Sequence, residues 1–226
     1  MADRKKSPSA EWQRLAAELR TDLPGDWSLR GKGRMTKLVR EPVDWRLCWV
    51  GFGKSAYSSA GWLYAAVQPL CTYFGGPPMS LNYGIRMDDV EGGPSSVDLT
   101  EPGAGDVVRD FLAGPAPATF DEWPLELFGT ASERNLARPR DERGTPRFWL
   151  LAPGCRVVLD TGSPVEPARE AAAYHLEWED GTAEEAAYYA GLADAFEAGG
   201  RDKALAYLED RKEAMLVAAD LATRRE

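Results

Sequence analysis

The chain has little of the residue types that most catalytic and metal sites need. It contains one histidine, His175, and three widely separated cysteines, Cys48, Cys71 and Cys155. A Ser–His–Asp or Cys–His catalytic arrangement must use that histidine or do without one. No Cys/His cluster has metal-ligand spacing, and the odd number of cysteines argues against a disulfide framework and fits a reducing compartment. We therefore expect a cytoplasmic protein with neither a metal nor a cofactor, and an enzyme is not favoured.

Long apolar runs are also missing. No run of about eighteen apolar residues occurs, so no transmembrane helix is expected, and the N-terminal MADRKKSPSAEW lacks the apolar stretch of a signal peptide. At 226 residues, with 44% hydrophobic residues and eight Trp, the chain can fill a core of one large or two small domains. Its net charge of −9 disfavours binding to nucleic acid or anionic membranes and favours basic protein partners.

The character of the sequence changes along the chain. Residues 1–91 are rich in aromatic and β-branched residues and include a basic stretch from Arg30 to Arg46. Residues 163–226 are Ala-rich and carry seven Lys or Arg against fifteen Asp or Glu, a net charge of −8. This contrast predicts a sheet domain over residues 1–162 and an acidic helical segment over residues 163–226, packed on it as one compact unit.

Local patterns predict the elements of the sheet domain. A helix capped by Ser9 is expected to bury one apolar face, formed by Trp12, Leu15, Ala16, Leu19 and Leu23. Clusters of Gly, Pro or Ser bound the predicted strands, which cover residues 27–30, 34–40, 44–52, 61–70 and 79–87. Because their connections are short, neighbouring strands should be antiparallel.

The second half should be mainly helical. Helices are expected over residues 106–113 and, with a break, over residues 121–137, whereas residues 148–152 and 156–159 read as extended pieces split by Pro153-Gly154. Three helices finish the chain, with a capping box at residues 182–185 and a break at Gly199-Gly200. The predicted fold is α+β: an antiparallel meander of four to six strands, helices mainly on one face, and an acidic three-helix C-terminal segment.

Two short motifs resemble known active sites. Val157–Ser163 matches the Asp-Thr-Gly pattern of aspartic proteases, in which two such carboxylates share a proton. The chain has one copy of this pattern, and a helix that starts at Ser163 would explain the same residues. Gly51, Gly53, Lys54 and Ser55 resemble the end of a phosphate-binding P-loop. The first glycine of that pattern is replaced by Cys48, and a turn rather than a helix follows.

The basic stretch allows three interpretations. Its cations, Arg30, Lys32, Arg34, Lys37, Arg40 and Arg46, could hold nucleic-acid phosphates with Trp27, Trp45 and Trp49 interleaved. They could instead form solvated strand faces and edges, or pair with the chain's own acidic helices. The two structural interpretations are favoured.

The acidic helices offer candidate partner-binding residues, because aromatic side chains amid carboxylates can anchor a basic protein. These candidates are Trp178, Glu184, Glu185, Tyr188 and Tyr189; any that are buried would instead belong to the helix core. The layout, with Leu63–Val67 as a central strand, weakly resembles small bacterial α+β domains, some of which are immunity proteins that neutralise toxins.

The leading hypothesis is therefore a non-enzymatic protein that docks a basic protein partner, with immunity as one version. The first alternative is a nucleotide- or metal-using enzyme, with the phosphate-binding residues Gly51, Gly53, Lys54 and Ser55 and nearby acidic loops. The second alternative is a structural subunit of a larger assembly. Neither the identity of the partner nor the oligomeric state follows from the sequence.

Overall fold

The computed structural model describes residues 7–74 and 83–222. Contacts divide this part of the chain into two compact units. The sheet unit comprises residues 7–68, 83–123 and 220–222, and the helical unit comprises residues 69–74 and 124–219. The boundary after residue 162 rests on charge and sequence pattern, and it stays a prediction.

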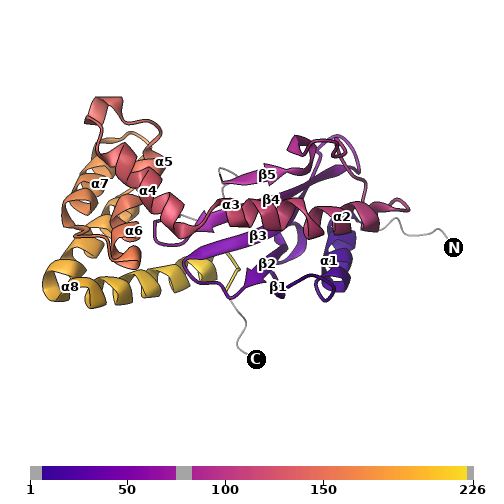
Figure 1. Cartoon of the computed structure of the whole chain (residues 1–226), viewed down its shortest axis with the longest axis horizontal. Helices are drawn as coiled ribbons and strands as arrows, with labels where there is room; N and C mark the ends of the chain where they lie inside the picture. Colours follow the sequence, from indigo (N-terminus) through magenta and orange to yellow (C-terminus); the bar gives the residue numbers. More distant parts are fainter. Residues whose placement is uncertain (1–6, 75–82, 223–226) are drawn as a thin grey trace. The chain divides into compact units, whose positions relative to one another are not determined.

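The sheet unit is built on one five-stranded antiparallel sheet in the order β1-β2-β3-β4-β5, which confirms the predicted α+β meander (Figure 1). In its register, Leu29 lies opposite Leu38 and Leu38 lies opposite Val50, so apolar positions face one another across strands. Residues 79–82 of the predicted fifth strand lie outside the described residues. The strands are β1 (Asp26–Arg30), β2 (Lys37–Glu41), β3 (Arg46–Lys54), β4 (Gly61–Pro69) and β5 (Gly84–Arg86).

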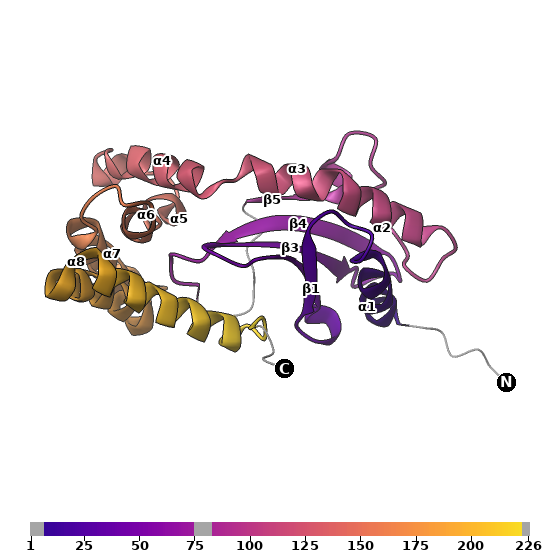
Figure 2. The same ribbon diagram turned by 60° about the horizontal axis from the view of Figure 1, so that its bottom comes forward.

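Helices α1 (Pro8–Leu19), α2 (Ala104–Ala113) and α3 (Pro115–Glu122) complete the sheet unit. Ser7, rather than the expected Ser9, caps α1: its hydroxyl accepts a hydrogen bond from the Ala10 N–H. Pro8 then takes the first helical position, where its missing N–H has no cost. The predicted apolar face of α1 is buried, which confirms its helical spacing. Figures 1 and 2 show α2 and α3 following one another along the sheet.

Helix α3 packs against one face of the sheet. Trp27 and Arg40 are directly opposed in the β1–β2 pair and therefore share a face. The ring of Phe120 lies 6.1 Å from that of Trp27, and the Asp121 carboxylate lies 3.7 Å from the Arg40 guanidinium. This face of the sheet is thus covered by helix, as the predicted one-sided arrangement requires.

Two glycines of β3 let long side chains lie flat on the opposite face of the sheet. A Cβ at Gly51 would come within 2.6 Å of Lys37 Nζ, and one at Gly53 within 2.5 Å of the Tyr64 hydroxyl. The Lys37 ammonium lies 4.3 Å from the centre of the Trp49 ring. Burial lowers the pKa of Lys37 to about 8. Side chains of the sheet itself therefore fill the space above both glycines.

The helical unit consists of five helices among the described residues. Helix α7 packs along α8, α4 packs on α5 and α6, and α6 also contacts α7 and α8. Their bounds are α4 (Leu125–Leu136), α5 (Pro146–Trp149), α6 (Ala152–Leu159), α7 (Val165–Glu177) and α8 (Ala183–Ala218). Short 3₁₀ helices also occur in loops of the described residues: η1 (Gly33–Met35) and η2 (Met87–Asp89) in the sheet unit, and η3 (Arg140–Glu142) in the helical unit.

The expectation of extended pieces at residues 148–152 and 156–159 is wrong, because both segments belong to helices or their connection. Pro153 lies in the first turn of α6, where a proline is tolerated. Gly154 is buried, and a Cβ at this position would come within 1.7 Å of the Cys71 carbonyl oxygen. The Pro-Gly pair therefore starts a helix and permits a close backbone approach, instead of forming a turn.

Helix α8 reverses direction at the predicted break. Gly199 and Gly200 have non-helical backbone angles, and Gly200 has a φ of 65°, which favours glycine. Beyond the break, the Tyr207 hydroxyl donates a 2.8 Å hydrogen bond to the Tyr188 carbonyl oxygen. Gly191 gives Tyr207 room, since a Cβ there would lie 2.7 Å from its hydroxyl oxygen. The two halves of α8 therefore pack on each other as a helical hairpin.

Candidate functional site

The turn between α7 and α8 is fixed by hydrogen bonds at both helix ends. At the end of α7, the Trp178 N–H donates to the Tyr174 carbonyl oxygen over 2.9 Å. At the start of α8, Thr182 and Glu185 form the predicted capping box: the Thr182 hydroxyl accepts from the Glu185 N–H, and the Glu185 carboxylate accepts from the Thr182 N–H. The residues between these ends are consequently held in one short connection.

Exposed apolar and acidic side chains gather at this turn. Leu176 is 71% exposed and Trp178 is 45% exposed. The Trp178 ring stacks on Tyr174, with ring centroids 5.6 Å apart and an interplanar angle of 28°, which limits its freedom. Glu179 and Asp180 follow and are exposed, and among the described residues no cation pairs with either. We name Leu176, Trp178, Glu179 and Asp180 the acidic corner.

The five residues predicted to bind a partner have different environments. Trp178 and Glu184 are exposed, whereas Glu185 is half-buried and engaged in the capping box. Tyr188 and Tyr189 are 3% and 2% exposed. These two tyrosines belong to the core face of α8, which is the alternative that the sequence left open.

Sequence reasoning missed Leu176. The buried positions of α7 include Ala168, Ala171, Ala172 and His175, which form one stripe at helical spacing. Leu176 falls outside that stripe, next to charged positions. A large apolar residue on the polar side of an amphipathic helix is the pattern that could have identified it.

His175 is a core residue of the helical unit. Its ring is 5% exposed and stacks on Tyr189 at 5.5 Å, with an interplanar angle of 8°. The Nδ1 atom lies 3.4 Å from the Glu185 carboxylate, which favours the protonated form. Burial outweighs that attraction and lowers the pKa of His175 below its usual 6.5. The His175 ring packs against the rings of Tyr174 and Tyr189, and these contacts account for it as a core residue.

A groove lies between the two halves of α8 and the segment that holds Tyr73 and Phe74. Its volume is about 320 Å³. Burial and the neighbouring Glu184 carboxylate raise the pKa of Tyr73. The Arg211 guanidinium lies 5.2 Å from the centre of the Tyr207 ring. We name this cavity the α8 groove; it is lined by Tyr73, Phe74, Glu184, Ala187, Tyr188, Arg211, Ala214, Met215 and Ala218.

The phosphate-binding candidates lie at a hairpin. Gly51, Gly53 and Lys54 belong to β3, and the Ser55 N–H donates to the Ala60 carbonyl oxygen across the turn into β4. A P-loop needs a helix whose N-terminal N–H groups face the phosphates. Here a strand follows instead, so the four residues do not form that cradle.

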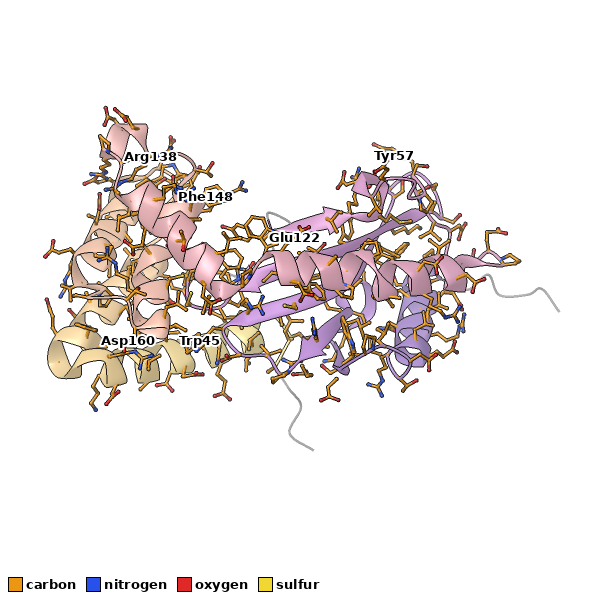
Figure 3. All side chains as sticks on the ribbon, in the orientation of Figure 1. Trp45, Tyr57, Glu122, Arg138, Phe148 and Asp160 are labelled. Atoms are coloured by element: carbon orange, nitrogen blue, oxygen red, sulfur yellow. The ribbon has the colours of Figure 1, made fainter. Side chains whose placement is uncertain are left out.

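Asp160 ends helix α6 and lies on the surface of the helical unit (labelled in Figure 3). It adopts a left-handed conformation with φ of 55°, and its side chain is 75% exposed. Arg201 lies 3.5 Å from its carboxylate and also donates to the carbonyl oxygens of Val157 and Val158. The Asp-Thr-Gly sequence therefore forms the C-terminal end of helix α6, with Asp160 as the C-cap.

The basic stretch is largely engaged within the sheet unit. Arg30 is 6% exposed, pairs with Glu41 over 2.5 Å, and donates to the Leu221 carbonyl oxygen over 2.7 Å. Arg46 donates to the carbonyl oxygens of Phe120 and Trp123, which end α3. These contacts agree with the structural interpretations of the stretch.

Within residues 7–74 and 83–222, no group of three or more His, Cys, Asp or Glu is arranged to hold a metal ion. None of the helices there combines the length and the apolar character needed to cross a bilayer. Comparisons of the chain with protein-family models, with curated protein sequences and with solved structures found no match.

Proposed function

We propose that this chain is a binding protein whose acidic corner docks a basic protein partner. The observation that carries the proposal is the pairing of two exposed apolar side chains, Leu176 and Trp178, with two carboxylates, Glu179 and Asp180, that have no cation among the described residues. Trp is enriched at the centres of protein interfaces, where surrounding residues exclude water. A single large anchor beside free negative charge fits that pattern.

The charge of the chain supports a basic partner. Complementary charge speeds encounter and selects among partners, even where it adds little to affinity. Residues 163–226 carry a net charge of −8, so the corner lies in the most acidic part of the sequence. Neutralisation of a basic toxin by an immunity protein is one concrete version of this function.

Affinity capture with matched variants tests the proposal. The wild-type chain and the Trp178→Ala variant would be used as baits in lysate of the source organism, with Tyr57→Ala as a control because Tyr57 is 99% exposed in the sheet unit. We expect quantitative mass spectrometry to find the same basic proteins enriched by the wild type and the control and lost with Trp178→Ala.

A charge-matched pair of variants completes the test. Glu179→Gln/Asp180→Asn removes the two carboxylates of the corner, whereas Asp141→Asn/Glu142→Gln removes two adjacent exposed carboxylates elsewhere in the helical unit. Capture should weaken with the first pair only. Equal capture by all four variants, or enrichment of acidic proteins, would count against the corner as the docking surface.

A further inference from the structure

The α8 groove has the construction of a small-ligand site. Its walls come from positions 184, 187 and 188 of the first half of α8 and from positions 211, 214, 215 and 218 of the second half. These positions recur at three- and four-residue spacing, so each half turns one face toward the groove. Three of them are alanines, and their small side chains leave the two helices open along this face.

The size and the apolar lining of the groove favour a small ligand with an apolar body. A volume of about 320 Å³ is at the lower end of the range of about 300–1,000 Å³ typical of small-molecule sites. Tyr188 and Met215 are buried, and Met215 Sδ also accepts a 3.3 Å hydrogen bond from the Phe74 N–H. That contact holds the aromatic segment at residues 73–74 against the second half of α8.

Opposite charges line the two sides of the groove. Glu184 belongs to the first half of α8, and Arg211 belongs to the second. The guanidinium is held over the Tyr207 ring, and no carboxylate pairs with it in the part of the chain that the structure describes. An Arg is suited to a carboxylate, with which it can form two parallel hydrogen bonds, and a Glu is suited to an ammonium.

The Tyr188 hydroxyl is a second feature that points to a ligand. Tyr188 lines the groove and is 3% exposed, yet its hydroxyl has no hydrogen-bond partner among the described residues. Buried polar groups are paired in folded proteins, and each exception needs a reason. A polar group of a bound molecule would supply the missing partner.

We propose that the α8 groove binds a small zwitterion with an apolar side chain, a free amino acid or a short peptide. Its ammonium would lie toward Glu184 and its carboxylate toward Arg211, with the side chain on Tyr188 and Met215. The residues of this site do not overlap with the acidic corner, so the ligand and the protein partner occupy different places.

Calorimetric titration with a panel of zwitterions and single-charge compounds tests the proposal on the full chain. The panel contains L-phenylalanine, L-leucine and the dipeptide Leu-Leu, together with phenethylamine, which lacks the carboxylate, and 3-phenylpropionate, which lacks the ammonium. We expect at least one zwitterion to bind at least about ten-fold more tightly than either single-charge compound, because it alone satisfies both groups. Comparing the affinities of the free amino acids with that of the dipeptide distinguishes a free amino acid from a short peptide as the ligand.

Three variants assign the contacts. Arg211→Gln should remove the preference for compounds with a carboxylate, and Glu184→Gln should remove the preference for those with an ammonium. Tyr188→Phe should unfold at the same temperature as the wild type without ligand, since no hydrogen bond is lost, but should bind less tightly. Arg147→Gln is the control, because Arg147 is an exposed arginine over a different ring, that of Phe148.

Each outcome decides the proposal. Zwitterion binding that weakens in Arg211→Gln and Glu184→Gln, but not in Arg147→Gln, supports it. Absence of binding by every panel member at millimolar concentration overturns it, as does binding that the single-charge compounds match. Circular dichroism of each variant confirms that a lost signal reflects the groove rather than unfolding.

Discussion

The basic stretch of the sheet unit and the acidic corner of the helical unit differ in how far the fold engages their charged side chains. In the sheet unit, Arg30 and Arg46 donate to backbone carbonyl oxygens, and Arg40 pairs with Asp121. In the helical unit, Glu179 and Asp180 extend from a turn and have no cation among the described residues. The cations Arg30, Arg40 and Arg46 are therefore engaged within the sheet unit, whereas the two carboxylates of the acidic corner are left to the solvent.

This difference separates two kinds of charge pattern that look alike in a sequence. A run of cations and a run of carboxylates both suggest a binding surface. The run of cations is explained here by hydrogen bonds that hold α3 and residue 221 against the sheet unit's own strands. What remains for a partner is the set of side chains that the fold does not use, and the acidic corner belongs to that set.

The largest effect on stability is expected for Arg30→Ala. This change removes the cation that pairs with the Glu41 carboxylate and the side-chain donor to the Leu221 carbonyl oxygen inside the sheet unit. Breaking such a pair typically costs about 3–5 kcal/mol of unfolding free energy. Urea denaturation measures the loss, with the exposed Arg34→Ala as control, for which a change within about 0.5 kcal/mol is expected. Equal losses of unfolding free energy in both variants would mean that the contacts of Arg30 contribute no more to the fold than the exposed Arg34 does.

A smaller, pH-dependent effect is expected for the helical unit. Burial lowers the pKa of His175 in the folded state, so on acidification the unfolded chain binds this proton first. The contribution of His175 to stability is therefore complete above its usual pKa of 6.5, and it is lost as the pH falls through the folded pKa. Glu185 faces the ring and moderates the loss.

Thermal unfolding of the wild type and of His175→Gln between pH 5 and pH 8 measures this effect. The midpoint of the wild type should fall more steeply on acidification than that of the variant, which has no imidazole to protonate. Parallel curves would mean that the environment of His175 is the same in the folded and the unfolded chain.

The smallest effect on stability is expected at the acidic corner itself. Because Glu179 and Asp180 are exposed and form no described ion pair, Glu179→Gln/Asp180→Asn should change the unfolding free energy by no more than about 0.5 kcal/mol. Urea denaturation in low and in high salt is the measurement. A clear destabilisation would show that these carboxylates support the fold. It would then count against the acidic corner as a docking surface.

Elements whose apolar residues recur at a regular spacing were predictable from the sequence. The spacing of Trp12, Leu15 and Leu19 reports which side of α1 faces the core, and the structure buries all three side chains. The capping box at Thr182 and the break at Gly199-Gly200 depend on local backbone chemistry, which a sequence displays directly.

The parts of the structure that the sequence did not predict depend on contacts between distant segments. Residues 147–160 have no distinctive period, and Gly154 is needed because α6 approaches Cys71, a contact that no local pattern contains. The burial of Tyr188 and Tyr189 likewise follows from packing within the helical unit. The α8 groove requires both halves of α8 and residues 73–74. Its lining could not be assembled before the hairpin was known.

Titration of a purified basic partner, obtained by capture, tests the central claim most directly. Its dissociation constant would be measured by calorimetry at increasing salt for the wild type, Trp178→Ala and Glu179→Gln/Asp180→Asn. We expect Trp178→Ala to weaken binding by about ten-fold or more at every salt concentration, and the charge variant to reduce the dependence on salt. Affinities that are the same for all three proteins at every salt concentration would contradict the account.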